Sequence, residues 1–223
     1  IMTVEGQIKI RKLCDDYQIR IPSLTGDCFM QAPFWKYGGS LREDLVTDFF
    51  AIIKACGQLN IGVIVMPLVD GGSLKTLSEE KILIDVLQKA QSLMTSLKIK
   101  IAFESDFPPS KLAKFIRKLE PEVFGINYDI GNSASLGFIA DEEFVSYGER
   151  ILNVHVKDRP LGLSTVPLGL GDADFDSVFK NLSNYGYKGN YILQTARDAD
   201  GMHSEILMEY REKTASWIAN HES

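Results

Sequence analysis

Short apolar runs alternate with longer amphipathic segments along the whole chain. The apolar runs are rich in β-branched and aromatic residues, which favour strands, and the amphipathic segments repeat their apolar positions with the period of a helix. The predicted strands are Arg20–Thr25, Ile61–Val69, Ile99–Glu104, Phe124–Asp129, Ile151–Val156 and Tyr191–Thr195. The predicted helices are Leu41–Leu59, Glu79–Leu97, Ser110–Leu119, Asp141–Leu152, Phe175–Tyr185 and a last one from about Met202 to Ala219. Because a helix follows each strand, the pattern predicts an α/β fold with a parallel sheet.

The choice between an open sheet and a closed barrel depends on the turns after the strands. No GxGxxG or P-loop sequence follows any predicted strand, and an open nucleotide-binding sheet is expected to carry one, so a barrel is favoured. A (β/α)8 TIM barrel takes about 250 residues, whereas six βα units already fill these 223 residues, and Glu5–Gln18 reads as a helix without its preceding strand. We therefore expect a single, partial TIM-barrel domain over residues 1–223 that lacks its first two βα units.

Polar residues stand at the carboxyl ends of the predicted strands, where both sheets and barrels bind their ligands. When the strands are read with a period of two, four consecutive strands each direct one possible metal ligand to the same end of the barrel. These ligands are Glu104, Asp129, His155 and Gln194. Two carboxylates, an imidazole and an amide oxygen make a mixed set that suits Mn, Mg, Co or Zn rather than a thiophilic ion.

Each of these residues also has a purely structural interpretation. A strand-end aspartate often caps the next helix, and a single histidine on an apolar strand is often a hydrogen-bonded rim residue. The set as a whole favours the metal site, because buried carboxylates that converge without a cation are costly.

Further polar and aromatic residues predict a substrate site at the same end. Lys157, Arg159 and Arg197 lie at or just past strand ends, where they could neutralise a phosphate or an enediolate oxygen; the alternative is solvated rim charges. The segment "GDCFMQAPFW" carries Trp35, which could form a lid or wall over a substrate. Its alternative role is packing under the barrel rim or at a subunit contact.

Composition and charge indicate which classes of binding partner to expect. The chain is 45% hydrophobic and 24% charged, with a net charge of -6 and a pI near 5.2, which argues against binding nucleic acid or an anionic membrane. Small molecules are the expected partners, and homo-oligomerisation is left open. The three cysteines have no metal-binding spacing and suit the reducing cytoplasm. No apolar stretch reaches the roughly 18 residues of a membrane span.

Four motifs resemble those of the xylose isomerase-like TIM barrels, which include sugar-phosphate isomerases and epimerases and endonuclease IV. They are "IAFESDF", "INYDIGNS", "VHVKDR" and "VPLGLGDADF". The chain is most similar to the hexulose-phosphate isomerase and pentulose-phosphate 3-epimerase branch. The resemblance implies one divalent ion held by Glu104, Asp129 and His155. It also implies a metal-dependent isomerase or epimerase that acts on a sugar or sugar phosphate through an enediolate, with Glu104 and Lys157 as catalytic residues.

Two positions depart from that branch. Gln194 stands where the last strand usually ends in a second glutamate, and Asn132 replaces a histidine found in many relatives. An amide can bind an ion as a weaker, fourth ligand, or contact a substrate, but it cannot take a proton near neutral pH. We therefore expect no two-base epimerase mechanism. The alternatives are a lyase of the inosose dehydratase type and a non-catalytic sugar-binding or assembly descendant. DNA repair is not expected, because a trinuclear zinc site needs more than the three histidines present.

Overall fold

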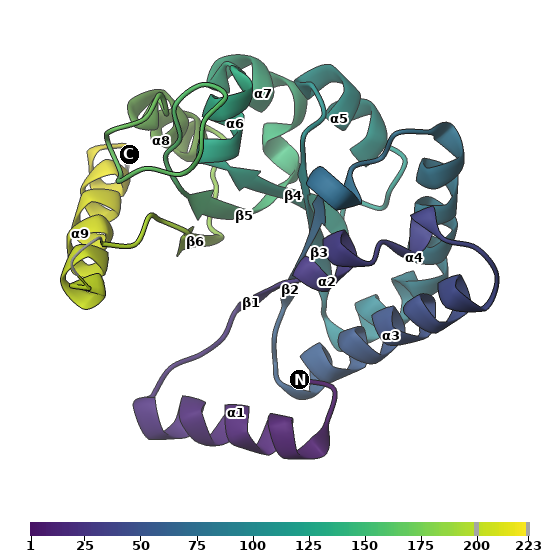
Figure 1. Ribbon diagram of the computed structural model, residues 1–223. Coiled ribbons are helices and arrows are strands. Elements are labelled where there is room, and N and C mark those ends of the chain that lie inside the picture. Colours follow the sequence, from purple (N-terminus) through teal and green to yellow (C-terminus); the bar gives the residue numbers. More distant parts are fainter. Residues whose placement is uncertain (199–200, 222–223) are drawn as a thin grey trace. The chain divides into compact units, whose positions relative to one another are not determined.

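Six strands make up the sheet of the computed structural model, which describes residues 1–198 and 201–221 (Figure 1). They are β1 (Ser23–Thr25), β2 (Val63–Leu68), β3 (Lys100–Ser105), β4 (Phe124–Asp129), β5 (Ile151–Val156) and β6 (Asn190–Leu193). The strands follow one another in the sheet in chain order. β1 pairs in parallel with β2, β2 with β3, β4 with β5, and β5 with β6. The predicted parallel α/β fold is confirmed.

Helices follow the strands at every step, as the sequence pattern predicts. The α-helices are α1 (Val4–Tyr17), α2 (Asp27–Gln31), α3 (Gly39–Gln58), α4 (Leu77–Leu97), α5 (Pro109–Ile116), α6 (Ile130–Leu136), α7 (Ala140–Tyr147), α8 (Phe175–Asn184) and α9 (His203–His221). Short 3-10 helices lie at Phe34–Lys36, Asp70–Gly72 and Gly148–Arg150. Within the described ranges, no helix combines the length and the apolar character that crossing a membrane requires.

The chain packs into two compact units. The first comprises Ile1–Ser105 and Arg117–Gly125, and the second comprises Asp106–Ile116 and Ile126–Ser223. The boundary between the two units falls within β4, between Gly125 and Ile126.

In the first unit, aromatic side chains pack the helices onto β2. Ile64 and Met66 of β2 are fully buried. The ring of Phe49 on α3 lies 5.6 Å from the rings of both Phe29 and Phe34. These contacts place the segment after β1 in the core of this unit.

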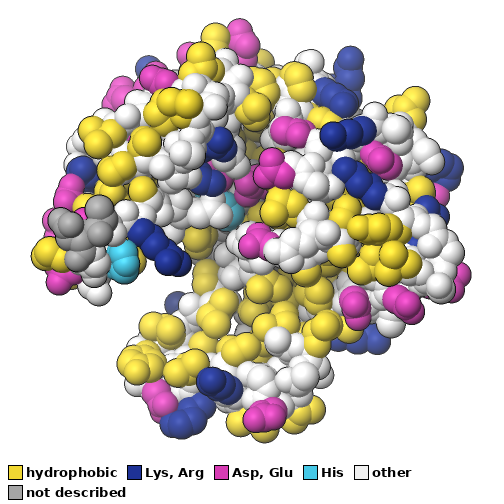
Figure 2. All heavy atoms as spheres, in the orientation of Figure 1, with side chains coloured by type: hydrophobic (Ala, Val, Ile, Leu, Met, Phe, Trp, Pro, Cys, Tyr) yellow, Lys and Arg dark blue, Asp and Glu magenta, His cyan; other side chains and the backbone are white. Residues whose placement is uncertain are grey.

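Helix α1 is the exception in the first unit, because much of its apolar surface is uncovered. Figure 2 shows hydrophobic side chains on this helix, and Val4 and Tyr17 are 75% and 71% exposed. One hydrogen bond, from Arg11 to the Gln58 carbonyl, links it to the end of α3.

In the second unit, the register between β4 and β5 shifts by one residue. Ile126 pairs with Ile151, but Asn127 pairs with Asn153, so that Leu152 is skipped. The shift is a bulge of the kind that re-aims side chains in a strand. It brings the polar positions of the two strands opposite each other.

Aromatic stacking packs α9 against α8 in the second unit. The Trp217 ring of α9 lies 4.2 Å from the Phe175 ring of α8 with an angle of 8° between their planes, and it also stacks on Phe179. Asp174 caps α8 by accepting a hydrogen bond from the Ser177 N–H.

Candidate functional site

Asp129 and His155 lie side by side at the carboxyl ends of β4 and β5. They pair in register, both side chains are 1% exposed, and His155 Nδ1 lies 3.7 Å from Asp129 Oδ2. Asp129 Oδ1 accepts a 2.8 Å hydrogen bond from the Asn132 N–H, which makes Asp129 the N-cap of α6. The capping role does not use the second carboxylate oxygen, which points toward His155 and Lys157.

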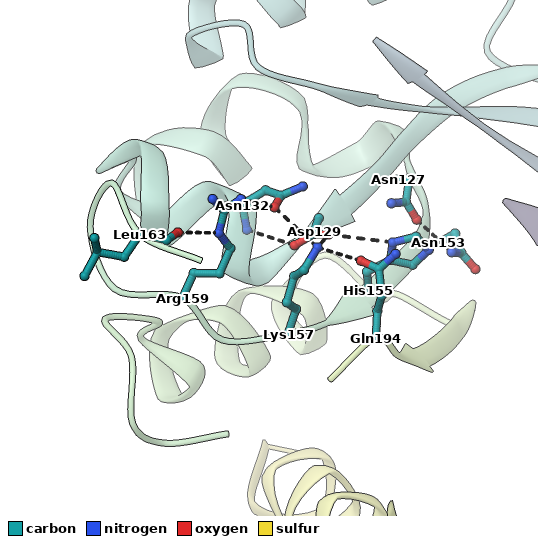
Figure 3. Close-up of polar contacts among 9 residues, drawn as sticks. All are labelled: Asn127, Asp129, Asn132, Asn153, His155, Lys157, Arg159, Leu163 and Gln194. Carbon is teal, nitrogen blue, oxygen red and sulfur yellow. Dashed lines mark hydrogen bonds and ion pairs between the residues drawn. The ribbon is translucent and has the colours of Figure 1, made fainter. Parts of the chain in front are cut away.

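Lys157 joins this pair to the segment after β6 (Figure 3). Its Nζ lies 3.2 Å from Asp129 Oδ2, 2.7 Å from Gln194 Oε1 and 3.4 Å from Asn132 Oδ1. An ammonium group has three N–H donors, so each faces one of these oxygens. Lys157 therefore binds both the Asp129 carboxylate at the end of β4 and the Gln194 amide that follows β6.

The surroundings of Asp129 favour its charged form. Burial raises the pKa of the Asp129 carboxyl, but the neighbouring His155, the Lys157 charge and the Asn132 N–H together hold that pKa below its usual value. The carboxylate is therefore available as an anionic ligand or as the partner of a cation.

Arg159 forms the outer part of the network. Its Nη1 donates a 2.7 Å hydrogen bond to Asn132 Oδ1, and its Nε donates a 2.8 Å hydrogen bond to the Leu163 carbonyl. The guanidinium is therefore fixed at two positions. Asn132 Oδ1 is shared by Arg159 and Lys157, so this amide connects the two cations.

A pair of amides lies one layer deeper on the same strands. Asn153 donates a 2.7 Å hydrogen bond from Nδ2 to Asn127 Oδ1, and the two residues are 0% and 2% exposed. Polar residues two positions before Asp129 and His155 lie on the same strand faces. The hydrogen bond between these amides links β4 to β5 next to the Asp129–His155 pair.

Glu104 belongs to the first unit. It lies near the end of β3, pairs in register with Pro67 and is 7% exposed. Among the described residues, Glu104, Asp129 and His155 form the group that could hold a metal ion. Hard carboxylate oxygens and a borderline imidazole nitrogen fit a divalent ion such as Mn, Mg, Co or Zn.

The other predicted site residues take different positions. Gln194 joins the network, but its amide oxygen is already bound by Lys157, so ion binding through that oxygen would require sharing or rotation. Arg197 is exposed. Trp35 is 1% exposed and donates its indole N–H to the Gly72 carbonyl at 3.2 Å, which matches the packing interpretation of its segment.

Two residues of this region, Asn127 and Asn153, were given no role from the sequence. They had one visible signal, since each is polar at an alternate position within a strand that is otherwise apolar. Asp158 binds backbone groups more than ten residues away, and no local pattern shows these partners.

A second buried cluster lies on the opposite face of β4. Tyr128 and Tyr147 donate hydrogen bonds of 2.7 and 2.6 Å to the carboxylate of Glu143, which also accepts one from Ser133. Burial raises the pKa of Glu143, although these hydrogen bonds oppose the rise. The cluster ties α7 to β4 and α6.

Comparison with known proteins gives a consistent picture. L-ribulose-5-phosphate 3-epimerase UlaE from Salmonella paratyphi A is 25% identical over 208 residues, which cover 90% of this chain and 72% of the epimerase. A xylose isomerase domain protein from Planctomyces limnophilus has the same fold, with a TM-score of 0.79 and 18% identity over 98% of this chain and 86% of that one. The IolI protein, solved with a zinc atom, also shares the fold, with a TM-score of 0.77 and 18% identity over 95% and 82% of the two chains.

The family model of the xylose isomerase-like TIM barrel matches residues 2–220. This match spans nearly the whole chain, from α1 to the end of α9. The chain therefore belongs to the xylose isomerase-like TIM-barrel family.

Proposed function

We propose that this protein is a metal-dependent isomerase or epimerase that acts on a sugar or a sugar phosphate by moving a proton through an enediolate. Family membership supports this proposal, as does a relative named as a ribulose-phosphate epimerase. The observation that carries it is the buried pair of Asp129 and His155 at neighbouring strand ends, with the Lys157 ammonium against the carboxylate.

The metal centre of this proposal consists of Glu104, Asp129 and His155 around one divalent ion. When bound, such an ion would polarise the carbonyl and the adjacent hydroxyl of a sugar, and so make the C–H of the hydroxyl-bearing carbon more acidic. Mn, Mg, Co and Zn all suit these ligands.

The proton transfers fall to the side chains of the chain itself. Glu104 is the proposed base, which takes a proton from the carbon beside the carbonyl and returns it to the neighbouring carbon. Lys157 is proposed to stabilise the enediolate oxygen by charge and hydrogen bonding. Asn132, Arg159 and Arg197 are proposed to bind the hydroxyls or phosphate of the substrate. Trp35 is left out of this site because it is buried.

The test combines metal analysis with solvent exchange. We expect about one divalent ion per chain in the native protein, and deuterium incorporation into a pentulose or hexulose phosphate in deuterated water. Glu104→Gln should lose at least about 100-fold in exchange, the usual scale for removing a general base. Glu122→Gln, at an exposed position of the same unit, is the matched control and should exchange like the parent. Product analysis separates isomerisation from dehydration, and a lack of exchange on every sugar would contradict the proposal.

One observation favours a second candidate, a sugar-binding protein without catalysis. Gln194 cannot carry a proton, and its oxygen is held by Lys157. This candidate predicts saturable sugar binding with no solvent exchange.

A further inference from the structure

Asp158 is fully buried and binds the backbone of the loop that follows it. Its Oδ2 accepts hydrogen bonds from the N–H groups of Gly169 and Gly171 at 2.8 and 2.9 Å, and its Oδ1 accepts one from Ala173 at 3.2 Å. Its own carbonyl accepts the Val166 N–H at 3.0 Å. A single residue therefore receives four N–H groups from residues 159–173, which we call the Asp158 loop.

The conformation of the Asp158 loop fits this carboxylate closely. A Cβ on residue 171 would lie 2.2 Å from Asp158 Oδ1, so only glycine can stand there. Gly169 has a φ of +92°, which also favours glycine. Asp172 closes the loop by accepting the Leu161 N–H at 2.7 Å. The loop is thus folded around Asp158, and the hydrogen bond between Leu161 and Asp172 joins its two ends.

The Asp158 loop supplies the acceptor that orients Arg159. The Leu163 carbonyl, which lies in the loop, accepts the Arg159 Nε–H, and Asn132 accepts from Nη1. Figure 3 shows the guanidinium between these two acceptors. Among the described residues, Arg159 Nη2 makes no hydrogen bond. The Nε–H and Nη1 lie on different sides of the guanidinium, so these two bonds fix its orientation and leave Nη2 to bind an anion; a planar guanidinium suits a phosphate group.

We propose that Asp158 is a positioning residue for substrate selection: it fixes the loop so that Arg159 presents Nη2 to the phosphate of a phosphorylated sugar. This inference rests on the proposed function, since it assigns the substrate class to that site. Asp158 itself touches no substrate. Its effect passes through the Leu163 carbonyl to the guanidinium, so preference for a phosphate should depend on the Asp158 charge.

Binding of two non-reactive polyols tests this without turnover. A pentitol 5-phosphate and the unphosphorylated pentitol have no carbonyl to isomerise, and calorimetry measures the affinity for each. We expect the parent to prefer the phosphate, and both Arg159→Met and Asp158→Asn to reduce that preference by about tenfold or more, the scale of one charge-assisted hydrogen bond. The double variant should lose no more than Arg159→Met alone, because both changes act through one guanidinium.

Two further variants keep the test decisive. Asp174→Asn alters an exposed carboxylate that caps α8 at the end of the same segment, and it should keep the parent preference. Asp172→Ala removes the Leu161 brace without changing the buried carboxylate, so it should weaken the preference even if Asp158→Asn does not fold. A parent without phosphate preference, or a preference that survives in both Asp158→Asn and Asp172→Ala, would overturn the inference. Phosphate preference without any solvent exchange would contradict the proposed catalysis alone.

Discussion

Gln194 is the residue that most sharply limits the chemistry of the proposed site. Its amide oxygen accepts a 2.7 Å hydrogen bond from Lys157, and an amide neither takes nor gives a proton near neutral pH. Inversion of a carbon needs a proton donor on each face of the enediolate, whereas transfer between neighbouring carbons on one face needs a single base. With Glu104 as the one evident base, aldose–ketose isomerisation should outrun epimerisation at carbon 3.

Gln194→Glu tests this limit directly. The new carboxylate would have the length of the amide and would lie against the Lys157 ammonium, where it can act as a second acid or base. In deuterated water we expect the variant to form the epimer with label at carbon 3, and the parent to exchange mainly at the isomerisation carbon. Gln194→Met has a similar length but no acid or base, so it should gain no epimer. Fast carbon-3 inversion by the parent would refute the limit.

At the residue scale, the sequence predicts which side chains face the site but not what they touch. Alternation along β4 and β5 places Asp129 and His155 on one face, as observed. The contact between Lys157 and Gln194 depends on the rotamers of two long side chains, which no pattern encodes. The burial of Trp35 depends on the packing of the whole first unit, so the lid and packing interpretations stayed equal in the sequence.

At the scale of elements, β4 and β5 match the prediction residue for residue, yet their register was not predictable. Without the shift at Leu152, Asp129 would lie opposite Val154, whose side chain is on the other strand face. Both strands look regular in sequence, so nothing marks the bulge. Helix α6 was also missed, because its glycine, asparagine and serines disfavour helix; the cap by Asp129 compensates.

The Glu143 cluster gives α7 a pH-dependent anchor. Because burial raises the pKa of Glu143 in the folded state, the folded protein holds this proton more tightly than the unfolded chain. Its contribution to the free energy of unfolding is therefore full below the unfolded pKa and is lost as pH rises through the folded pKa. Glu143→Gln does not titrate, so it should flatten this decline.

Urea unfolding from about pH 4 to pH 8 measures the decline. At the acid end we expect Glu143→Gln to be less stable than the parent by about 1 kcal/mol, because an amide has one acceptor oxygen for the three hydroxyl donors around it. Glu142→Gln, at the exposed neighbouring position, should keep the parent pH profile. An identical profile for Glu143→Gln would show that the cluster does not titrate in this range.

At the scale of the whole molecule, six strands in chain order agree with the barrel predicted from the spacing of βα units. The division into two compact units was not predictable, because no linker or change of composition marks it; the boundary falls within β4 itself. The exposure of the apolar side chains of α1 was likewise not predictable, since its amphipathic pattern resembles that of any surface helix. Length and spacing therefore predict the fold, and tertiary packing decides its subdivision.

The proposed metal centre has a consequence for the stability of the whole chain. Its three proposed ligands are Glu104, Asp129 and His155. An ion that binds only the folded protein stabilises it by about 2.7 kcal/mol at a concentration 100 times its Kd. For a chain of this size that corresponds to a rise in Tm of about 5 to 10 °C.

Thermal unfolding with and without excess Mn or Zn checks this rise and its origin. Glu104→Gln and His155→Ala should each abolish it, because each removes one of the three proposed ligands, and His155→Ala should also lose stoichiometric metal while staying folded. His203→Ala, at an exposed position on α9, removes an imidazole outside the centre and should keep the full rise. If Glu104→Gln kept the rise while His155→Ala lost it, Asp129 and His155 would hold the ion without Glu104, and Glu104 would act only as the base. If His155→Ala bound as much metal as the parent, the buried pair of Asp129 and His155 would be structural, and the metal-dependent mechanism would have to be abandoned.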